Sequence, residues 1–277
     1  MQIKINSTIL LTSILWLLLC VTNSIASNDS KPQKPKNNPA KTIHVLVALC
    51  DNQYQRIVPV PARIGNGDDL VNNLYWGAAY GVKNYFNKSK EWKLISSTKD
   101  PKPGIILERV IFKNNNSNTY LIADAYRGRE IKKCTSDLLN FAAGKAKEQI
   151  EVSINSEKVK LNAGGQANLI AYIGHNGLMD FQLDNYPKQV DENKRDIVIL
   201  ACASRNYFQN PILTSGANPI LWTTNFMAPE AYVLEAAVNS WINNENLESV
   251  RLKAAQAYDK YQKCGIKGAL RLFSSSW

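Results

Sequence analysis

Short runs of consecutive apolar residues most constrain how this 277-residue chain can fold. Three runs, at residues 43–49, 169–173 and 197–201, have the length of a β-strand, and residues 220–224 predict a further strand. Their near-continuous rather than alternating apolar character is typical of strands that are covered on both faces. Helical patterns lie between and after these strands. The order of the elements therefore predicts an α/β fold with a mainly parallel sheet flanked by helices.

The remaining elements are predicted from periodicity. Apolar residues that recur at every fourth position predict a helix over residues 69–86, although Gly77 and Gly81 lie within it. A hairpin is expected from strands at 105–112 and 120–126 with an Asn-rich turn between them. Other strands are expected at 92–97 and 269–273, and other helices from about 130 to 150, at 229–241 and at 247–263.

The first 26 residues predict a secretory signal peptide. Lys4 precedes an apolar run over residues 9–21, and Ser24-Ile25-Ala26 supplies a small-x-small cleavage pattern. The apolar run is short for a membrane span, so an uncleaved anchor is the less favoured alternative. A Pro/Lys-rich leader then covers residues 27–41, and residues 42–277 are expected to form a single domain. We therefore expect an exported protein, either periplasmic or secreted.

The net charge of +10 at pH 7 bears on which kinds of molecule the protein is expected to bind. Lys4 is the single charged residue in the predicted signal peptide, so cleavage would leave a strongly basic chain. The basic residues are not interleaved with aromatic residues as they are in nucleic-acid-binding motifs. We therefore expect no nucleic-acid partner, whereas association with anionic cell-surface polymers is compatible with the charge.

Two of the predicted strands end in reactive residues. His175 follows the strand at 169–173, and Cys202 follows the strand at 197–201. In parallel sheets the residues that do chemistry collect at the carboxyl ends of the strands, so adjacent strands would bring these two side by side. A histidine can generate the thiolate form of a neighbouring cysteine, and the backbone N–H of Gly177 could face the reacting carbonyl. This arrangement predicts a His–Cys catalytic dyad.

A hydrophobic strand that ends in His and Gly, followed by a strand that ends in Ala-Cys-x-Ser, resembles the caspase-like cysteine peptidases. This superfamily includes legumains, gingipains and metacaspases, and the order of His before Cys is theirs. The resemblance is best over residues 169–204. It implies a three-layer α/β sandwich that hydrolyses peptide bonds in a peptide or protein substrate, with His175 as general acid/base and Cys202 as nucleophile. It also implies an oxyanion hole formed by the backbone N–H groups of Gly177 and Cys202.

The sequence differs from the family pattern at two points. Asn176 separates His175 from Gly177, and the His-to-Cys spacing of 27 residues is shorter than the ~50 of caspases. Only residues 181–195 are then left for the crossover between the two strands.

The resemblance also suggests where a substrate would bind. Asp51 follows the first strand, where a carboxylate could pair with a basic substrate side chain and direct cleavage after basic residues. The alternative, which we favour, is that Asp51 only caps its own loop. Asp124 and Asp180 are weaker acidic candidates. An extended substrate is expected beside the strand at 220–224, along Trp222, Thr223, Thr224 and Asn225.

Non-catalytic interpretations remain open at this stage. His175 could be a turn histidine that is hydrogen-bonded to backbone, and Cys202 could be a buried structural residue. In an oxidising compartment Cys202 could also pair with one of the other cysteines that follow the signal peptide, Cys50, Cys134 and Cys264. The rival hypothesis is therefore a non-catalytic exported α/β protein that binds a partner or a cell-envelope polymer.

The sequence predicts no metal and no cofactor. Its two histidines and dispersed cysteines do not form the cluster that a tetrahedral zinc site requires. It also lacks a phosphate-binding loop and a complete dinucleotide-binding glycine pattern.

Overall fold

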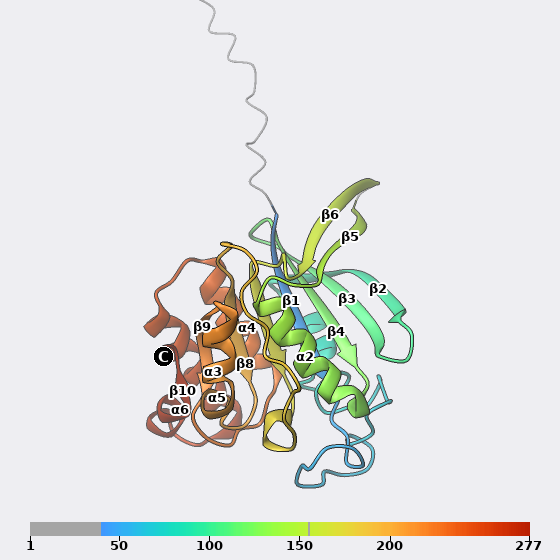
Figure 1. The fold of residues 1–277 in the computed structure, drawn as a ribbon. Helices are drawn as coiled ribbons and strands as arrows, with labels where there is room; N and C mark the ends of the chain where they lie inside the picture. The colour runs from blue at the N-terminus through green and yellow to red at the C-terminus, as the bar shows by residue number, and fades with distance from the viewer. Residues whose placement is uncertain (1–39, 155) are drawn as a thin grey trace, which may run out of the picture. The chain divides into compact units, whose positions relative to one another are not determined.

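A computed structural model describes residues 40–154 and 156–277 of the protein (Figure 1). The predicted signal peptide and nearly all of the predicted leader lie outside the described residues. Among the described helices, none is long and apolar enough to cross a membrane. The strands are β1 (Lys41–Ala48), β2 (Trp92–Lys102), β3 (Ile106–Asn114), β4 (Thr119–Tyr126), β5 (Lys147–Ile154), β6 (Glu157–Gly164), β7 (Leu169–Ile173), β8 (Asp196–Leu200), β9 (Asn218–Thr223) and β10 (Phe273–Ser274). The helices are α1 (Val82–Lys88), α2 (Ile131–Ala142), α3 (Ser204–Ser215), α4 (Ala231–Ile242), α5 (Leu247–Gln262) and α6 (Ile266–Leu272).

Eight of the strands form one sheet in the order β10-β9-β8-β7-β1-β4-β3-β2. The five strands from β9 to β4 in this order run parallel to one another, whereas β10, β3 and β2 are antiparallel to their neighbours. Strands β5 and β6 form a separate antiparallel hairpin. The prediction of a mainly parallel sheet is therefore confirmed.

Helices cover both faces of this sheet. Along β1, Ile43, Val45 and Val47 face a core that includes residues of α1, α4 and α5. Leu46 and Ala48 point to the opposite face, where α2 and α3 pack. Figure 1 shows α2 on the near side of the sheet. Because both faces of β1 are buried, residues 43–48 are apolar except for His44. With helices on both faces of the sheet, the protein is a three-layer α/β sandwich.

The strands were predicted more accurately than the helices. The four apolar runs correspond to β1, β7, β8 and β9, each within two residues at either end. The predicted hairpin is also confirmed, because β3 and β4 pair in antiparallel register. Helices α4 and α5 lie where the periodicity placed them.

The predicted helix over residues 69–86 is wrong, because only α1 at its end is helical and the rest forms tight turns. The Asn73 side chain holds these turns: its Nδ2 donates to the carbonyls of Cys50 and Asn66, at 2.8 and 2.9 Å. The backbone folds back on itself so closely that a Cβ at Gly77 would lie 2.2 Å from the Val71 carbonyl oxygen. Tyr75 and Trp76 are buried by these tertiary contacts, whereas Val71 is 75% exposed, so the apolar residues of this segment do not share one buried helical face.

Two further predictions differ from the structure, and one helix was not predicted. The helix expected from about residue 130 to 150 ends with α2, because Gly144 adopts a φ of 80° that stops it, and β5 follows. The expected strand at 269–273 is mostly helix α6, and only its last residue belongs to β10. Helix α3 was not predicted, because few of its residues are apolar and two of its buried ones are serines.

A buried network of charged groups ties the middle of the sheet to the hairpin. His44 on β1 is fully buried, and its Nε2 lies 3.0 Å from Oδ2 of Asp124 on β4. Arg109 on β3 donates to both oxygens of Asp124, at 2.6 and 2.7 Å, and to Glu148 on β5. The backbone N–H of Gly164 donates to Nδ1 of His44 at 2.8 Å, so the His44 proton sits on Nε2. Asp124 therefore belongs to a structural network inside the fold.

The same contacts set the charge state of Asp124. Burial alone would raise the pKa of this carboxyl group, but hydrogen bonds from Arg109 and His44 outweigh burial and lower the pKa to about 2. Asp124 is therefore ionised at neutral pH even though it is almost entirely enclosed.

Candidate active site

The carboxyl ends of β7 and β8 bring His175 and Cys202 to neighbouring positions. The two strands pair in parallel, with Ile173 opposite Leu200, and the candidate residues each lie two positions beyond this pair. The side chain of Asn176 links the two strand ends, because its Nδ2 donates to the Cys202 carbonyl at 2.7 Å. The condition for bringing the two residues side by side, that their strands are neighbours, is therefore met.

Cys202 occupies a sharp turn between β8 and α3. Ala203 has a left-handed φ of 47°, which reverses the chain so that α3 can begin at Ser204. The Cys202 sulfur is half-buried and lies 3.4 Å from the backbone nitrogen and 3.5 Å from the carbonyl oxygen of Met227. The turn therefore holds the thiol beside the backbone of Met227, two residues before α3 begins.

Buried hydroxyl groups lock this turn in place. The Ser204 hydroxyl donates to the Ile199 carbonyl at 2.8 Å and accepts from the backbone N–H of Thr223 at 2.9 Å. The Thr223 hydroxyl in turn donates to the Ala201 carbonyl. Thr223, a predicted substrate-binding residue, is fully buried and fixes the turn that carries Cys202.

The edge of β9 is paired with the last residues of the chain. Strand β10 lies antiparallel beside it, and the backbone N–H of Thr224 donates to the Leu272 carbonyl at 2.9 Å. The side chain of Trp222 is fully buried and its Nε1 donates to the Ser276 carbonyl at 3.0 Å. Among the predicted substrate-binding residues of this segment, Asn225 lies beyond these contacts and is exposed.

The ring of His175 is held by Asp180, in the turn that follows β7. Nε2 of His175 lies 2.8 Å from Oδ2 of Asp180, and the two side chains are only 9% and 14% exposed. The His175 carbonyl accepts a hydrogen bond from the Tyr172 hydroxyl at 2.6 Å. Within residues 40–154 and 156–277, no hydrogen bond joins the His175 ring to the Cys202 thiol or occupies Nδ1 of His175. Asp180 was named from the sequence only as an acidic candidate for substrate, and its contact with His175 was missed.

The next feature is the pair of backbone N–H groups, of Gly177 and Cys202, that are predicted to form the oxyanion hole. Gly177 begins a short 3₁₀ turn, Gly177–Met179, and is packed so tightly that a Cβ there would lie 2.5 Å from the Phe181 ring. In the part of the chain that the structure describes, no acceptor takes a hydrogen bond from the backbone N–H of Gly177 or of Cys202.

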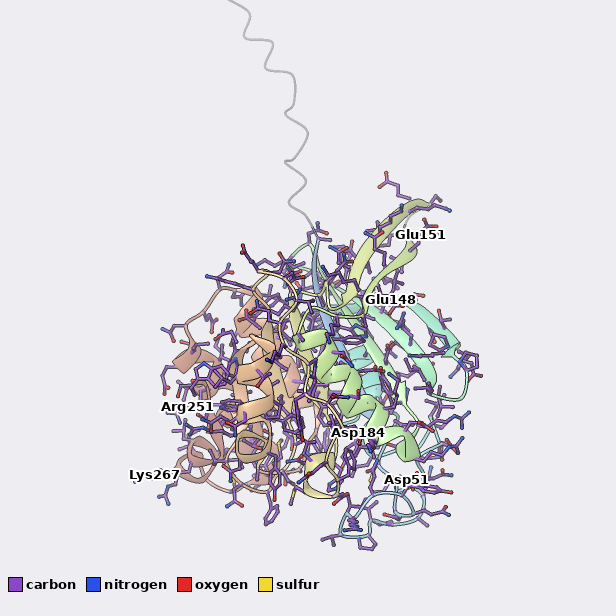
Figure 2. The ribbon with its side chains drawn as sticks, in the orientation of Figure 1. Asp51, Glu148, Glu151, Asp184, Arg251 and Lys267 are labelled. Carbon is purple, nitrogen blue, oxygen red and sulfur yellow. The ribbon has the colours of Figure 1, made fainter. Side chains whose placement is uncertain are left out.

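Asp51 is bound to its own loop. Its Oδ1 accepts hydrogen bonds from the backbone N–H groups of Gln53 and Tyr54, at 2.9 and 3.2 Å. A Cβ at Gly67 would lie 2.1 Å from Oδ2, and a Cβ at Gly128 would lie 2.3 Å from the Asp51 Cβ. Figure 2 shows Asp51 among the loops that follow β1. These contacts are those expected of a residue that caps its loop.

The other thiols differ from Cys202 in their surroundings. All four described cysteines are free, so no disulfide joins Cys202 to another described residue. Burial raises the pKa of the Cys50 thiol to about 11, although a hydrogen bond with Tyr75 partly lowers it. Burial likewise raises the pKa of Cys134 well above its ordinary value, and Cys264 is exposed.

A surface hollow of about 440 Å³ lies beside the segment that follows β9. Thr224, Asn225 and Phe226 form one wall, and residues of α5, α6 and the loop between them form the other. Met227, which contacts the Cys202 sulfur, comes directly after this wall. Cys202 itself is not among the residues that line the hollow.

No group of three or more His, Cys, Asp or Glu side chains arranged to hold a metal ion occurs among the described residues. The chain was also compared with models of known protein families, with curated proteins and with solved structures, and none of the three comparisons found a match.

Proposed function

We propose that the protein is an exported thiol hydrolase of caspase-like fold that cleaves peptide bonds. Cys202 is the nucleophile and His175 is the general acid/base. The observation that carries this proposal is the parallel pairing of β7 with β8, which puts a histidine and a half-buried thiol on adjacent strand ends. The three-layer sandwich and the order of His before Cys support it. Export rests on the signal-peptide pattern of residues 1–26.

The reaction proceeds through an acyl-enzyme. His175 takes the proton of the Cys202 thiol, and the thiolate attacks the substrate carbonyl carbon to form a C–S bond. The backbone N–H groups of Cys202 and Gly177 are the donors assigned to the developing oxyanion. The tetrahedral intermediate expels the amine, which receives its proton from His175. Water, deprotonated by His175, then attacks the thioester, and the acid product leaves with the thiol restored.

We do not propose that Asp51 selects a basic substrate side chain. A carboxylate that selects a basic side chain needs a free face toward the substrate. Asp51 instead bonds two backbone N–H groups of its own loop and is only 6% exposed. Substrate contact is assigned to Asn225 and the hollow beside it.

Cleavage of an unfolded protein mixture tests this function. The mature wild-type protein is expected to generate new peptide termini that mass spectrometry detects, and Cys202→Ser is expected to generate none. Glu151→Gln, a change at an exposed side chain on β5, should cleave like the wild type. Undiminished cleavage by folded Cys202→Ser would contradict the proposal.

A further inference from the structure

We infer that Asp180 is a positioning residue for His175, holding Nε2 of the ring and leaving Nδ1 as the nitrogen that exchanges protons with Cys202. This inference rests on the proposed function and adds to it a third residue and an assignment of the two ring nitrogens.

The geometry of the pair supports this role. Asp180 Oδ2 lies 2.8 Å from His175 Nε2, and both side chains are largely enclosed. An ionised carboxylate accepts hydrogen bonds but donates none, so the ring nitrogen that faces it carries the proton. The lone pair of the neutral ring is then on Nδ1, where no described residue hydrogen-bonds it. The ring is therefore in the tautomer that can accept a thiol proton at Nδ1.

The Asp180 side chain also contacts the loop that follows β1. Its Oδ2 accepts a hydrogen bond from the backbone N–H of Arg56 at 3.1 Å, in the loop that follows β1. The backbone N–H of Asp180 donates to the Gly177 carbonyl at 2.9 Å. The carboxylate is thus fixed between two loops, and a fixed carboxylate restricts the rotation of the ring that it contacts.

The pair also stabilises the intermediate that the mechanism requires. When His175 has taken the thiol proton, the ring carries a positive charge. A carboxylate at hydrogen-bond distance in a poorly hydrated site favours that charge. An amide at the same place would lack the negative charge and could donate a hydrogen bond to Nε2, which would favour the tautomer with its proton on Nδ1 and block the use of Nδ1 as a base.

The test compares Asp180→Asn and Asp180→Glu with Asp184→Asn. Asp184 lies in the same crossover, but its side chain is 88% exposed and its nearest ion pair, with Lys132, spans 3.9 Å. With the peptide that the wild type cleaves best, Asp180→Asn is expected to lower kcat about 10²-fold or more while KM changes less than about 3-fold. Asp180→Glu should recover part of kcat because it restores the carboxylate. Asp184→Asn should stay within about 2-fold of the wild type.

Thermal melting of each variant separates positioning from folding. A kcat of folded Asp180→Asn within about 3-fold of the wild type would overturn the inference. Equal losses in Asp180→Asn and Asp180→Glu, with melting temperatures lowered in parallel, would also overturn it, because the residue would then be structural. If Cys202→Ser cleaves normally, the proposed function fails and this inference fails with it. If Cys202→Ser is inert while Asp180→Asn is fully active, the inference alone fails.

Discussion

Replacing His175 by alanine is expected to lower kcat/KM for peptide hydrolysis about 10³-fold, which corresponds to about 4 kcal/mol of transition-state stabilisation. The variant loses the base that generates the Cys202 thiolate and the acid that protonates the leaving amine. Residual cleavage would come from substrate binding and from the oxyanion donors, which the substitution leaves in place. The measurement is steady-state hydrolysis of a peptide that the wild type cleaves.

Two controls make this result interpretable. The melting temperature shows whether the variant is folded, because the substitution also removes the contact between His175 and Asp180. Tyr207→Phe, a change at an exposed side chain on α3, should keep wild-type kinetics. A folded His175→Ala protein that keeps more than about a third of the wild-type kcat/KM would contradict the assignment of His175 as acid/base.

Asp124→Asn is expected to lower the free energy of unfolding by about 3–5 kcal/mol. The substitution keeps the shape of the side chain but removes the charge that compensates Arg109, which is only 9% exposed. Glu148 still contacts Arg109, but it lies at the surface, where it is well hydrated. Denaturant unfolding measures the effect. The matched control is Glu151→Gln, which breaks an exposed ion pair with Lys158 and should cost less than about 1 kcal/mol.

The Asp124 carboxylate also makes the free energy of unfolding depend on pH in the acid range. The folded-state pKa of Asp124, about 2, lies below its ordinary value of 3.8, so the folded protein binds fewer protons than the unfolded chain between these values. Its contribution, on the order of 2 kcal/mol, is therefore complete above pH ~4 and is lost as the pH falls toward 2. In Asp124→Asn, the free energy of unfolding should therefore fall less between pH ~4 and ~2 than it does in the wild type. Two results for Asp124→Asn would together contradict this account of the network. They are an unchanged acid transition and a decrease in the free energy of unfolding no larger than that of Glu151→Gln.

The sequence was sufficient to predict the inner strands of the sheet because these strands are buried on both faces. Continuous apolar runs mark β1, β7 and β8 directly, and such runs have few alternative folds. The turns before α1 were mistaken for helix because their apolar residues recur at helical spacing. The conformation of that segment is determined by the Asn73 side chain, which bonds the carbonyl of Cys50, and by the close approach of Gly77 to Val71. The spacing of apolar residues indicates neither contact.

For the candidate site, the sequence predicted which two strand ends carry the reactive residues, and the structure shows that these strands are adjacent. Functional residues in parallel sheets lie at the carboxyl ends of the strands, and this rule pointed to His175 and Cys202 because it requires only the order of the elements along the chain. The partner of His175 was not predictable, since Asp180 reaches the ring through a 3₁₀ turn that has no apolar periodicity. The pairing of β9 with β10 was missed for a similar reason: β10 is two residues long and follows a helix. An Asp five residues after a strand-end histidine was the one available signal for Asp180.

Alkylation of the native mature protein at mildly acidic pH tests the central claim most directly, with labelled peptides quantified by mass spectrometry. Cys50 and Cys134 serve as internal references, because burial raises the pKa of both and only roughly one Cys50 thiol in 10⁴ is ionised at neutral pH. Exposed Cys264 is the reference for an accessible thiol. We expect Cys202 to react at least about 10-fold faster than Cys264 and to lose this advantage in His175→Ala. Labelling of Cys202 that is slower than that of Cys264, or unchanged in His175→Ala, would contradict an activated His–Cys dyad.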